Sequence, residues 1–314
     1  YNIDPVFYTR QRPSEIDDNE LSKNETRRIF IDEIFPQQDL IEGQSRIQNT
    51  LDINFIPNLK GPYNNKSDFF NNDLKDNWAG ITRKINSTNF EQSNVEFIQF
   101  WLLDTFSDSQ SIENDLGSLV INLGNISEDI LSDGKKLYEN GLPSRNSQQL
   151  VNTSNWGKSP VTQSLVYSFD SDPNNRILQD LGYDGLNDSD ELNIYTNGSI
   201  DDPAGDNYEY YLNANGGIQD RYLNYNGVQG NSPVSTTDSN RGSTTIPDSE
   251  DANQDNTMNT IDSYFQYRIP IKKIMNVNNH PFVTDVRENV SVDLPNGQKL
   301  NTRWIQFKIP VFQQ

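Results

Sequence analysis

The chain of 314 residues contains no cysteine. Disulfide cross-links and thiol chemistry are therefore excluded, and the fold must be stabilised by other contacts. A secreted bacterial protein can do without disulfides when divalent cations take over the cross-linking role. The absence of cysteine therefore directs attention to oxygen-rich loops that could hold such ions.

Histidine is nearly absent as well, because His280 is the only one. It lies in a turn-like stretch around which no Ser/His/Asp triad can be assembled, and we expect a surface turn residue. Residues 215–218 match neither glycine-rich nucleotide pattern. A glycosidase pair cannot be singled out among 45 acidic residues. We therefore predict that the chain is not an enzyme, with no catalytic residue and no organic cofactor.

Basic residues are scarce, since 25 Lys and Arg face 45 Asp and Glu, for a formal net charge of −20. Such a surface repels phosphate, which excludes a nucleic-acid partner, and it attracts cations. No apolar run approaches the roughly 18 residues of a membrane-spanning helix. Residues 1–5 lack the basic region and apolar core of a signal peptide, so we expect a mature product or a piece of a longer protein.

Residues 251–262 have the ligand spacing of a twelve-residue calcium loop. Side-chain oxygens occupy loop positions 1, 3, 5, 7, 9 and 12, namely Asp251, Asn253, Asp255, Thr257, Asn259 and Asp262. An aromatic stretch follows at once, which favours a metal-stapled extracellular β protein over a helix-loop-helix sensor. We predict a structural calcium ion here, with a solvated loop of Asx turns as the alternative.

Two positions of this loop depart from the ideal pattern. Asn256 replaces the glycine of position 6, which is tolerable because Asn adopts left-handed φ more readily than most residues. Asp262 at position 12 is one methylene shorter than Glu, which weakens bidentate ligation. We therefore expect affinity of about 100 µM to millimolar, as in extracellular modules.

A second acidic run contains Asp180, Asp184, Asp188, Asp190 and Glu191. Its spacing resembles the Asp-rich turns of thrombospondin type-3 repeats, and glycines within it let the chain fold back so that carboxylates converge. Carboxylates this close repel one another unless a cation or water screens them. We predict a second calcium site, with a merely soluble loop as the alternative. Residues 201–206 could donate ligands to either site.

The overall pattern predicts a mostly β protein: an antiparallel, jelly-roll-like β-sandwich with few short helices and a long Asp/Asn/Gly-rich, calcium-ordered excursion. The expected parts are an N-terminal arm and linking strand (1–45), the sandwich core (46–167), the acidic excursion (168–262) and the closing strands (263–314). Residues 1–28 should have little core of their own. Strands are expected at 28–35, 50–56, 94–103 and 118–123. The best-packed region should begin at residue 78, and a short helix should form at 127–134.

Residues 264–271 and 304–311 match position by position as aromatic, apolar, Gln, aromatic, basic, Ile, Pro, β-branched. Residues 97–101 form a weaker third copy. Two neighbouring strands of one sheet, connected through Asn296-Gly297, would explain the match, and three pairs would share a face: Phe265/Ile305, Tyr267/Phe307 and Ile269/Ile309. The alternative is that aromatic strands simply look alike.

Nine blocks, spread in order from about residue 50 to the end, resemble the SprA (Sov) family. They are KGPYN at 60–64, WAGITR at 78–83, VEFIQFW at 95–101, NLGNISEDIL at 122–131, ENGLP at 139–143, QDLGYDGL at 179–186, GNSP at 230–233, PDSEDANQDN at 247–256 and WIQFKIP at 304–310. The resemblance implies part of the giant outer-membrane β-barrel translocon that passes folded, signal-tagged cargo to the cell surface in type IX secretion and gliding motility of Bacteroidota.

A mean hydropathy of −0.79 is too polar for repeated barrel-wall strands. The resemblance therefore implies a soluble domain of the translocon, on the extracellular side of the outer membrane and without a membrane span of its own. It would cap or shape the barrel, and contact the remainder of the barrel protein, other translocon subunits and secreted cargo. The competing hypothesis is a secreted calcium-dependent carbohydrate-binding or adhesion module, because jelly-roll glycan binders combine aromatic strands with structural calcium.

Overall fold

The computed structural model describes residues 3–66, 74–86, 90, 92–107, 115–137, 151–153, 158–162, 172, 174, 179, 182, 186–225 and 249–311. Its described helices are short: η1 Pro5–Tyr8, η2 Glu20–Ser22, α1 Ile31–Ile34, η4 Leu74–Asp76, α3 Asp188–Glu191 and α4 Ile218–Arg221. Its strands are β1 Phe97–Leu103, β2 Asp115–Asn125, β3 Val151–Thr153, β4 Lys158–Pro160, β5 Ser263–Lys272, β6 Val283–Asp293 and β7 Lys299–Pro310. The expected mostly β class with few short helices is confirmed.

The chain divides into two compact units. Unit 1 comprises Tyr1–Ile53, Ile85–Gly124 and Ser263–Gln314. Unit 2 comprises Asn54–Lys84 and Asn125–Asp262. Among the described residues, no helix combines the length and apolar character needed to cross a membrane.

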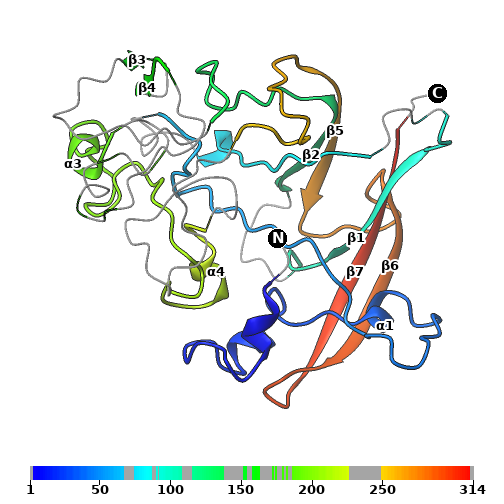
Figure 1. Cartoon of the computed structure of the whole chain (residues 1–314). Helices are drawn as coiled ribbons and strands as arrows, with labels where there is room; N and C mark the ends of the chain where they lie inside the picture. The colour runs from blue at the N-terminus through cyan, green and yellow to red at the C-terminus, as the bar shows by residue number, and fades with distance from the viewer. Residues whose placement is uncertain are drawn as a thin grey trace. The chain divides into compact units, whose positions relative to one another are not determined.

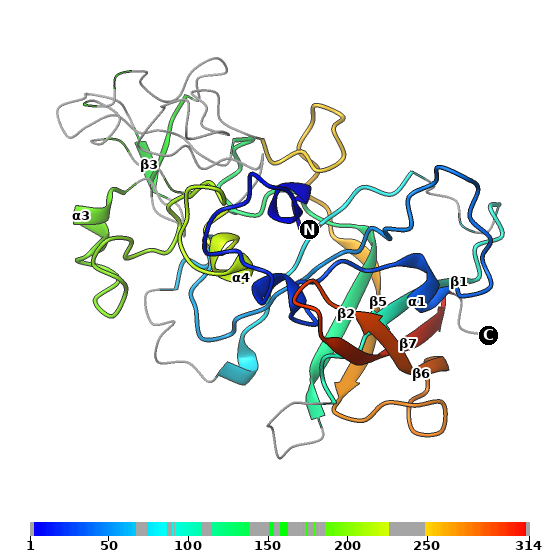
Figure 2. The same ribbon diagram turned by 90° about the horizontal axis from the view of Figure 1, so that it is seen from below.

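Unit 1 contains two sheets, which Figures 1 and 2 show from two directions. The strand order of the first is β1-β7-β6, with both pairs antiparallel. In this sheet Phe307 lies opposite Phe100 on one side and Val283 on the other. The second sheet pairs β2 with β5. The strands expected at 94–103 and 118–123 are thus confirmed as β1 and β2.

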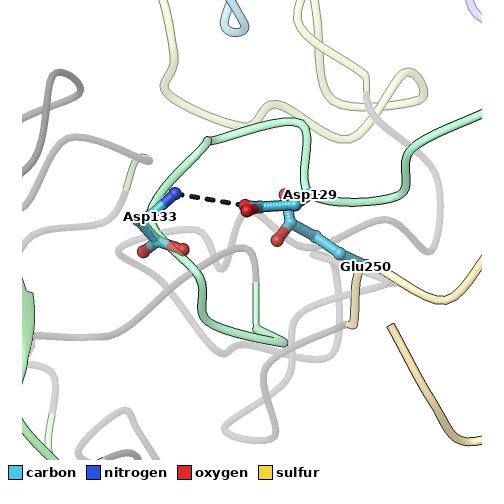
Figure 3. Close-up of side chains that lie close together, drawn as sticks. All are labelled: Asp129, Asp133 and Glu250. Atoms are coloured by element: carbon cyan, nitrogen blue, oxygen red, sulfur yellow. Dashed lines mark hydrogen bonds between the residues drawn. The ribbon is translucent and has the colours of Figure 1, made fainter. Parts of the chain in front are cut away.

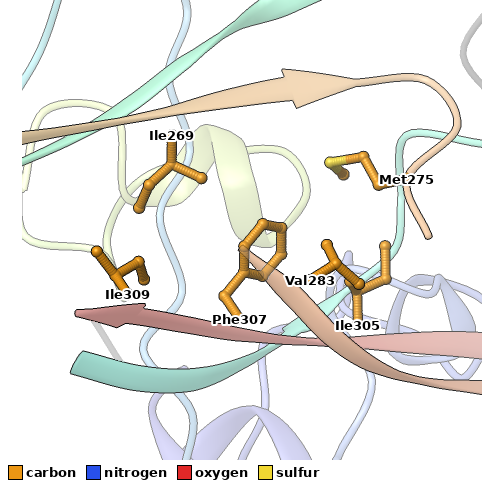
Figure 4. Close-up of a cluster of buried hydrophobic side chains, with 6 residues drawn as sticks. All are labelled: Ile269, Met275, Val283, Ile305, Phe307 and Ile309. Carbon is orange, nitrogen blue, oxygen red and sulfur yellow. The ribbon is translucent and has the colours of Figure 1, made fainter. Parts of the chain in front are cut away.

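One apolar core serves both sheets of unit 1. Its buried members are Ile269, Met275, Val283, Ile305, Phe307 and Ile309 (Figure 4). Partly buried side chains pack against them from β1 and β2, namely Ile98, Phe100, Leu102, Leu119 and Ile121. In β7, Ile305, Phe307 and Ile309 all enter the core because side chains alternate between the faces of a strand. The rings of Phe100 and Phe307 stack with centroids 5.2 Å apart, which adds specific geometry to the burial.

The internal sequence match marks the core-facing residues but not the strand pairing. Ile269, Ile305, Phe307 and Ile309 share the core as expected, whereas Phe265 is 73% exposed. The expectation that residues 264–271 and 304–311 form neighbouring strands is wrong, since β5 pairs with β2 and β7 lies between β1 and β6. The turn through Asn296-Gly297 instead closes a β6–β7 hairpin, with Gly297 at φ +82°. The hairpin takes one edge of β7 because it closes the shortest loop, and β1 occupies the other edge.

The strand expected at 28–35 is wrong, because Ile31–Ile34 form one helical turn, α1. Glu33 causes the turn: its Oε1 accepts the main-chain N–H of Phe30 at 2.8 Å. The same carboxylate pairs with both terminal nitrogens of Arg27 at 2.9 Å, and both side chains are buried. Trp304 Nε1 donates to Glu33 Oε2 at 3.3 Å. This buried network fixes the segment against β7.

The first residues of the chain contribute core of their own. Phe7, Ile16 and Leu21 are fully buried, although their surroundings in sequence are polar. Asp4 caps η1 by accepting the N–H of Val6 at 2.9 Å. Short turns that bury single apolar side chains give no periodic signal in the sequence.

The further strand expected at 50–56 is wrong as well. Residues 50–56 and 78–83 have no strand partner among the described residues, and Leu51, Ile53 and Phe55 are exposed. Trp78, placed by the sequence in the best-packed region, is 85% exposed. Alternation predicts a strand only where a second strand is available to pair with it, and none pairs with these stretches among the described residues.

Candidate metal centres

Two segments of unit 2 lie side by side and are joined by hydrogen bonds to acidic side chains. The outgoing segment, residues 127–134, follows β2, and the returning segment, residues 249–262, leads into β5. Ser127 N–H donates to Asp262 Oδ1 at 2.8 Å, and Glu128 N–H donates to the carbonyl oxygen of Asn259 at 2.7 Å. These bonds join the two ends of a span of about 130 residues.

Glu128 links the outgoing segment to the predicted calcium loop. Its Oε1 accepts the main-chain N–H of Asn253 at 3.1 Å. Its Oε2 accepts the main-chain N–H of Asn259 at 2.8 Å and the side-chain amide of the same residue at 3.1 Å. The carboxylate is buried, and these three donors compensate for its lost hydration.

Glu250 makes the reciprocal contact. Its Oε1 accepts the N–H groups of Ile130 and Leu131, both at 3.0 Å. This contact explains why the short helix expected at 127–134 is wrong. A helix would direct the N–H of Leu131 to the carbonyl four residues earlier, whereas here Glu250 takes it, and Ser132 adopts φ +52°.

In the predicted calcium loop, the first ligand side chains make hydrogen bonds within the loop itself. Asp255 N–H is shared between Asp251 Oδ1 at 3.0 Å and Asn253 Oδ1 at 2.9 Å. Asn256 N–H donates to Asp251 Oδ2 at 2.8 Å, and the hydroxyl of Thr257 donates to Asp255 Oδ1 at 2.5 Å. The hydrogen bonds from Thr257 hold the pKa of Asp255 below its ordinary value. Four of the six predicted ligand positions thus lie in one turn.

The remaining two predicted ligands make contacts outside the loop. The Asn259 amide donates to Glu128, and Asp262 Oδ1 accepts the N–H of Ser127. Asn256 adopts φ +66°, the left-handed conformation expected of position 6. Lys136 Nζ donates to the carbonyl oxygen of Asn256 at 2.7 Å and lies 3.8 Å from Asp251 Oδ2. The described groups of three or more converging acids do not include Asp251, Asp255 or Asp262.

A cluster of three carboxylates lies where the two segments meet, formed by Asp129, Asp133 and Glu250 (Figure 3). One oxygen from each lies within 4.8 Å of the others. Asp129 Oδ1 accepts the N–H of Asp133 at 3.1 Å, which closes the turn. Burial raises the pKa of Asp133 above its ordinary value. Burial also raises the pKa of Glu250 to about 8, and the charges of Asp133 and Asp129 add to the effect.

A second carboxylate cluster involves part of the predicted 180–191 site. The structure brings Asp188 and Glu191 of α3 together with Asp202, their oxygens again within 4.8 Å. Glu191 is buried and accepts the N–H of Ala204 at 3.0 Å, while Asp188 accepts the Asn207 amide at 2.8 Å.

Three predicted members of that site are not part of this cluster. Asp190 is not among the converging acids, and Asp180 and Asp184 lie outside the described residues. Asp202 belongs to the stretch 201–206 that the sequence allowed as a donor. Burial raises the pKa of its carboxyl. Three oxygens so arranged could hold a cation that prefers carboxylates.

Sequence reasoning missed Glu128 and Glu250 as site residues, and also Asp129 and Asp133. Their partners lie about 120 residues away along the chain. The sequence of residues 127–134 predicts a capped helix, in which acids in the first turn are unremarkable. The one available signal was the Asp-x-x-x-Asp-Gly pattern at residues 129–134, which favours a tight acidic turn.

His280 is buried rather than at the surface, although it does lie in a turn. Its Nδ1 accepts the N–H of Phe282 at 3.2 Å, so Nε2 carries the proton that is donated to the carbonyl oxygen of Pro270 at 2.8 Å. Its ring meets Phe307 edge-on at 5.2 Å. Both ring nitrogens are thus used to hold the turn against the core.

Comparison with known families gives one match. The family model SprA_N, described as a motility related/secretion protein, matches residues 184–314. No curated protein matches the chain. The matched range contains α3, α4, the predicted calcium loop and strands β5 to β7. It supports a SprA-related protein and a link to secretion and motility.

Proposed function

We propose that this chain is a non-catalytic domain of a SprA-like outer-membrane protein translocon, where it caps or shapes the barrel on the extracellular side. The observation that carries the proposal is the match of residues 184–314 to the motility and secretion family. The remainder of the barrel protein, other translocon subunits and secreted cargo would be its partners. The net charge of −20 is consistent with a domain that works in water rather than in lipid.

The fold that we propose for this role is a β-sandwich with a calcium-ordered excursion. The shared core of the β1-β7-β6 and β2-β5 sheets supports two packed layers. The paired outgoing and returning segments support an excursion that is closed at its base. Calcium at residues 251–262 and near Asp188 would then be structural.

An exposed stretch of unit 2 supports attachment to a larger assembly. Trp78 and Ile81 are both exposed, in a stretch without strand pairing. Contiguous exposed apolar side chains mark interaction sites more often than single ones do, and this stretch exposes two large ones within four residues. We propose that the stretch 78–83 contacts the barrel protein or its subunits.

The test is a double substitution, Trp78→Ala with Ile81→Ser, in the full-length natural gene. We expect secretion and motility to fall while the protein still reaches the outer membrane, because neither side chain contributes to a core. Thr82→Ala is the matched control, an exposed residue of the same stretch, and should leave both activities intact. Unchanged secretion and motility in the double variant would contradict this role for the stretch.

The full gene offers an independent check. Beyond this chain it should encode repeated segments of about ten alternating residues, the pattern of barrel-wall strands. A gene without such segments would remove the basis for a translocon.

The alternative is a secreted calcium-dependent carbohydrate-binding or adhesion module, and the same exposed Trp78 favours it, since indole rings stack on sugars. A glycan array distinguishes the two. Binding that Trp78→Ala abolishes and Thr82→Ala preserves would favour the module over the translocon domain.

A further inference from the structure

The carboxylates of Asp129, Asp133 and Glu250 converge from two segments that are distant in the sequence (Figure 3). Two oxygens bound to one calcium ion at 2.3–2.6 Å lie no more than about 5 Å apart. The three oxygens, within 4.8 Å of one another, meet that limit. Three carboxylates at such distances repel one another strongly in a partly buried site unless positive charge or protons intervene.

Glu250 provides a second and independent observation. Its side chain is completely buried, with 0% exposure. Oε1 is satisfied by two N–H groups, but Oε2 has no hydrogen-bond partner among the residues that the structure describes. A buried carboxylate oxygen without a partner costs free energy that a bound cation would recover. Figure 3 shows this carboxylate directed toward that of Asp129.

The lysines nearest in the sequence donate to main-chain carbonyls, although the charge of Lys135 also acts on Asp133 and opposes the rise in its pKa that burial causes. Lys135 Nζ donates to the carbonyl oxygen of Val161 at 3.1 Å. Lys136 Nζ donates to the carbonyl oxygen of Asn256 at 2.7 Å. Among the residues that the structure describes, no ion pair involves Asp129, Asp133 or Glu250. The cluster thus has excess negative charge and an open acceptor.

We propose that Asp129, Asp133 and Glu250 bind one divalent cation, with Ca²⁺ preferred. The ligands are exclusively oxygen, which suits Ca²⁺ and Mg²⁺ and not the metals that favour nitrogen or sulfur. They come from an irregular turn and from a second segment, and Ca²⁺ tolerates irregular coordination that Mg²⁺ does not. Water and main-chain carbonyls would complete the shell.

The ion would lock the outgoing turn to residue 250 of the returning segment. This site is distinct from the loop at 251–262 and from the Asp188 cluster, and it does not depend on the proposed translocon role. Its effect would be to hold together the base of the excursion. Loss of the ion would loosen both segments at once, because Glu250 also holds the N–H groups of Ile130 and Leu131.

The experiment measures Ca²⁺ and Mg²⁺ binding to the chelator-treated chain by calorimetry and by counting bound ions at equilibrium. Glu250→Gln keeps the shape and the Oε1 acceptor but removes the charge, and Asp133→Asn tests a half-buried ligand that leaves Glu250 intact. We expect either variant to bind one ion fewer, or to bind that ion at least about tenfold more weakly. Asp39→Asn, an exposed acid outside every predicted metal site, is the matched control and should retain this ion.

Circular dichroism of each variant establishes that it is folded before binding is compared. Ca²⁺ should bind more tightly than Mg²⁺ at this site. Ion counts and affinities that are unchanged in both Glu250→Gln and Asp133→Asn would overturn the proposal. Absence of any Ca²⁺ binding to the unaltered chain would overturn it as well.

Discussion

Glu128 and Glu250 are reciprocal anchors of the two segments that close the excursion. Glu128, on the outgoing segment, accepts N–H groups from Asn253 and Asn259 of the returning segment. Glu250, on the returning segment, accepts N–H groups from Ile130 and Leu131 of the outgoing segment. Each carboxylate therefore accepts main-chain N–H groups that carbonyl oxygens would accept in a strand or a helix. The base of the excursion is held by side chains acting on the main chain.

Glu128→Ala should loosen the predicted calcium loop. The change leaves three N–H groups of Asn253 and Asn259 without their acceptor, and we expect a loss of about 2–4 kcal/mol in unfolding free energy. Hydrogen exchange should accelerate at the amides of residues 253 and 259. Glu128→Gln retains one acceptor oxygen and should cost less. Unchanged exchange rates in the alanine variant would contradict the anchoring role.

The strands that carry the core were predictable from the sequence. The apolar run that became β1 and the alternating residues of β7 show their core faces directly, because burial of one face imposes a period of two. Phe100 and Phe307 illustrate this, since both were on a predicted strand and they stack in the core. Strand pairing was less predictable. The sequence match between β5 and β7 reflects that both strands face the same core, and not that they pair with each other.

The candidate site was only partly predictable. Local spacing identified Asp251, Asn253 and Asp255, which do gather in one turn. Glu128 and Glu250 were not identifiable, because their roles depend on contacts across about 120 residues. The same reason accounts for the failed helix at 127–134, where a distant carboxylate competes with local hydrogen bonds. Local signals are reliable only where no distant polar group takes the main-chain donors.

Gly124→Ala should destabilise the β2–β5 sheet. Gly124 has φ +148°, and an added Cβ would lie 2.5 Å from the carbonyl oxygen of Ser263 and 2.7 Å from Tyr264 Cα. Both contacts are with main-chain atoms, so the strands would have to separate, at about 2–4 kcal/mol. Gly117→Ala is the control, since it also has positive φ but nothing within 4 Å. Chemical denaturation of both variants should therefore show a larger loss of unfolding free energy for Gly124→Ala than for Gly117→Ala.

Glu33→Gln should be among the most damaging single changes in unit 1. It leaves buried Arg27 without its bidentate partner and weakens the acceptor of Phe30 and Trp304, with an expected loss of about 3–5 kcal/mol. Asp32→Asn breaks the exposed pair with Arg46 instead and should cost about 1 kcal/mol or less. Similar denaturation midpoints for the two variants would show that the buried pair contributes little.

Tyr8 should make the protein sensitive to alkali. Burial raises the pKa of its phenol to about 12, while an unfolded tyrosine titrates near 10. Below pH 10 both states keep the proton, so stability is unaffected. Between pH 10 and about 12 the unfolded state releases the proton and the folded state keeps it, so the free energy of unfolding falls. Denaturation of Tyr8→Phe should show a shallower fall in that window, and equal slopes would contradict burial of the phenol.

Removal of calcium tests the loop at residues 251–262. If the ion binds only the folded chain with a dissociation constant of about 1 mM, 10 mM Ca²⁺ should add about 1.4 kcal/mol of stability over the chain in EDTA. Asp251→Asn with Asp255→Asn should abolish most of the gain, because both carboxylates lie in the ligand turn. Asp39→Asn, an exposed acid elsewhere, controls for net charge. The Glu250→Gln variant should keep the part of the calcium stabilisation that this loop supplies. Thermal unfolding of Glu250→Gln and of the Asp251→Asn, Asp255→Asn double variant therefore shows which site supplies the stabilisation. An equal melting temperature in EDTA and in calcium would show that the loop is held by its own hydrogen bonds alone.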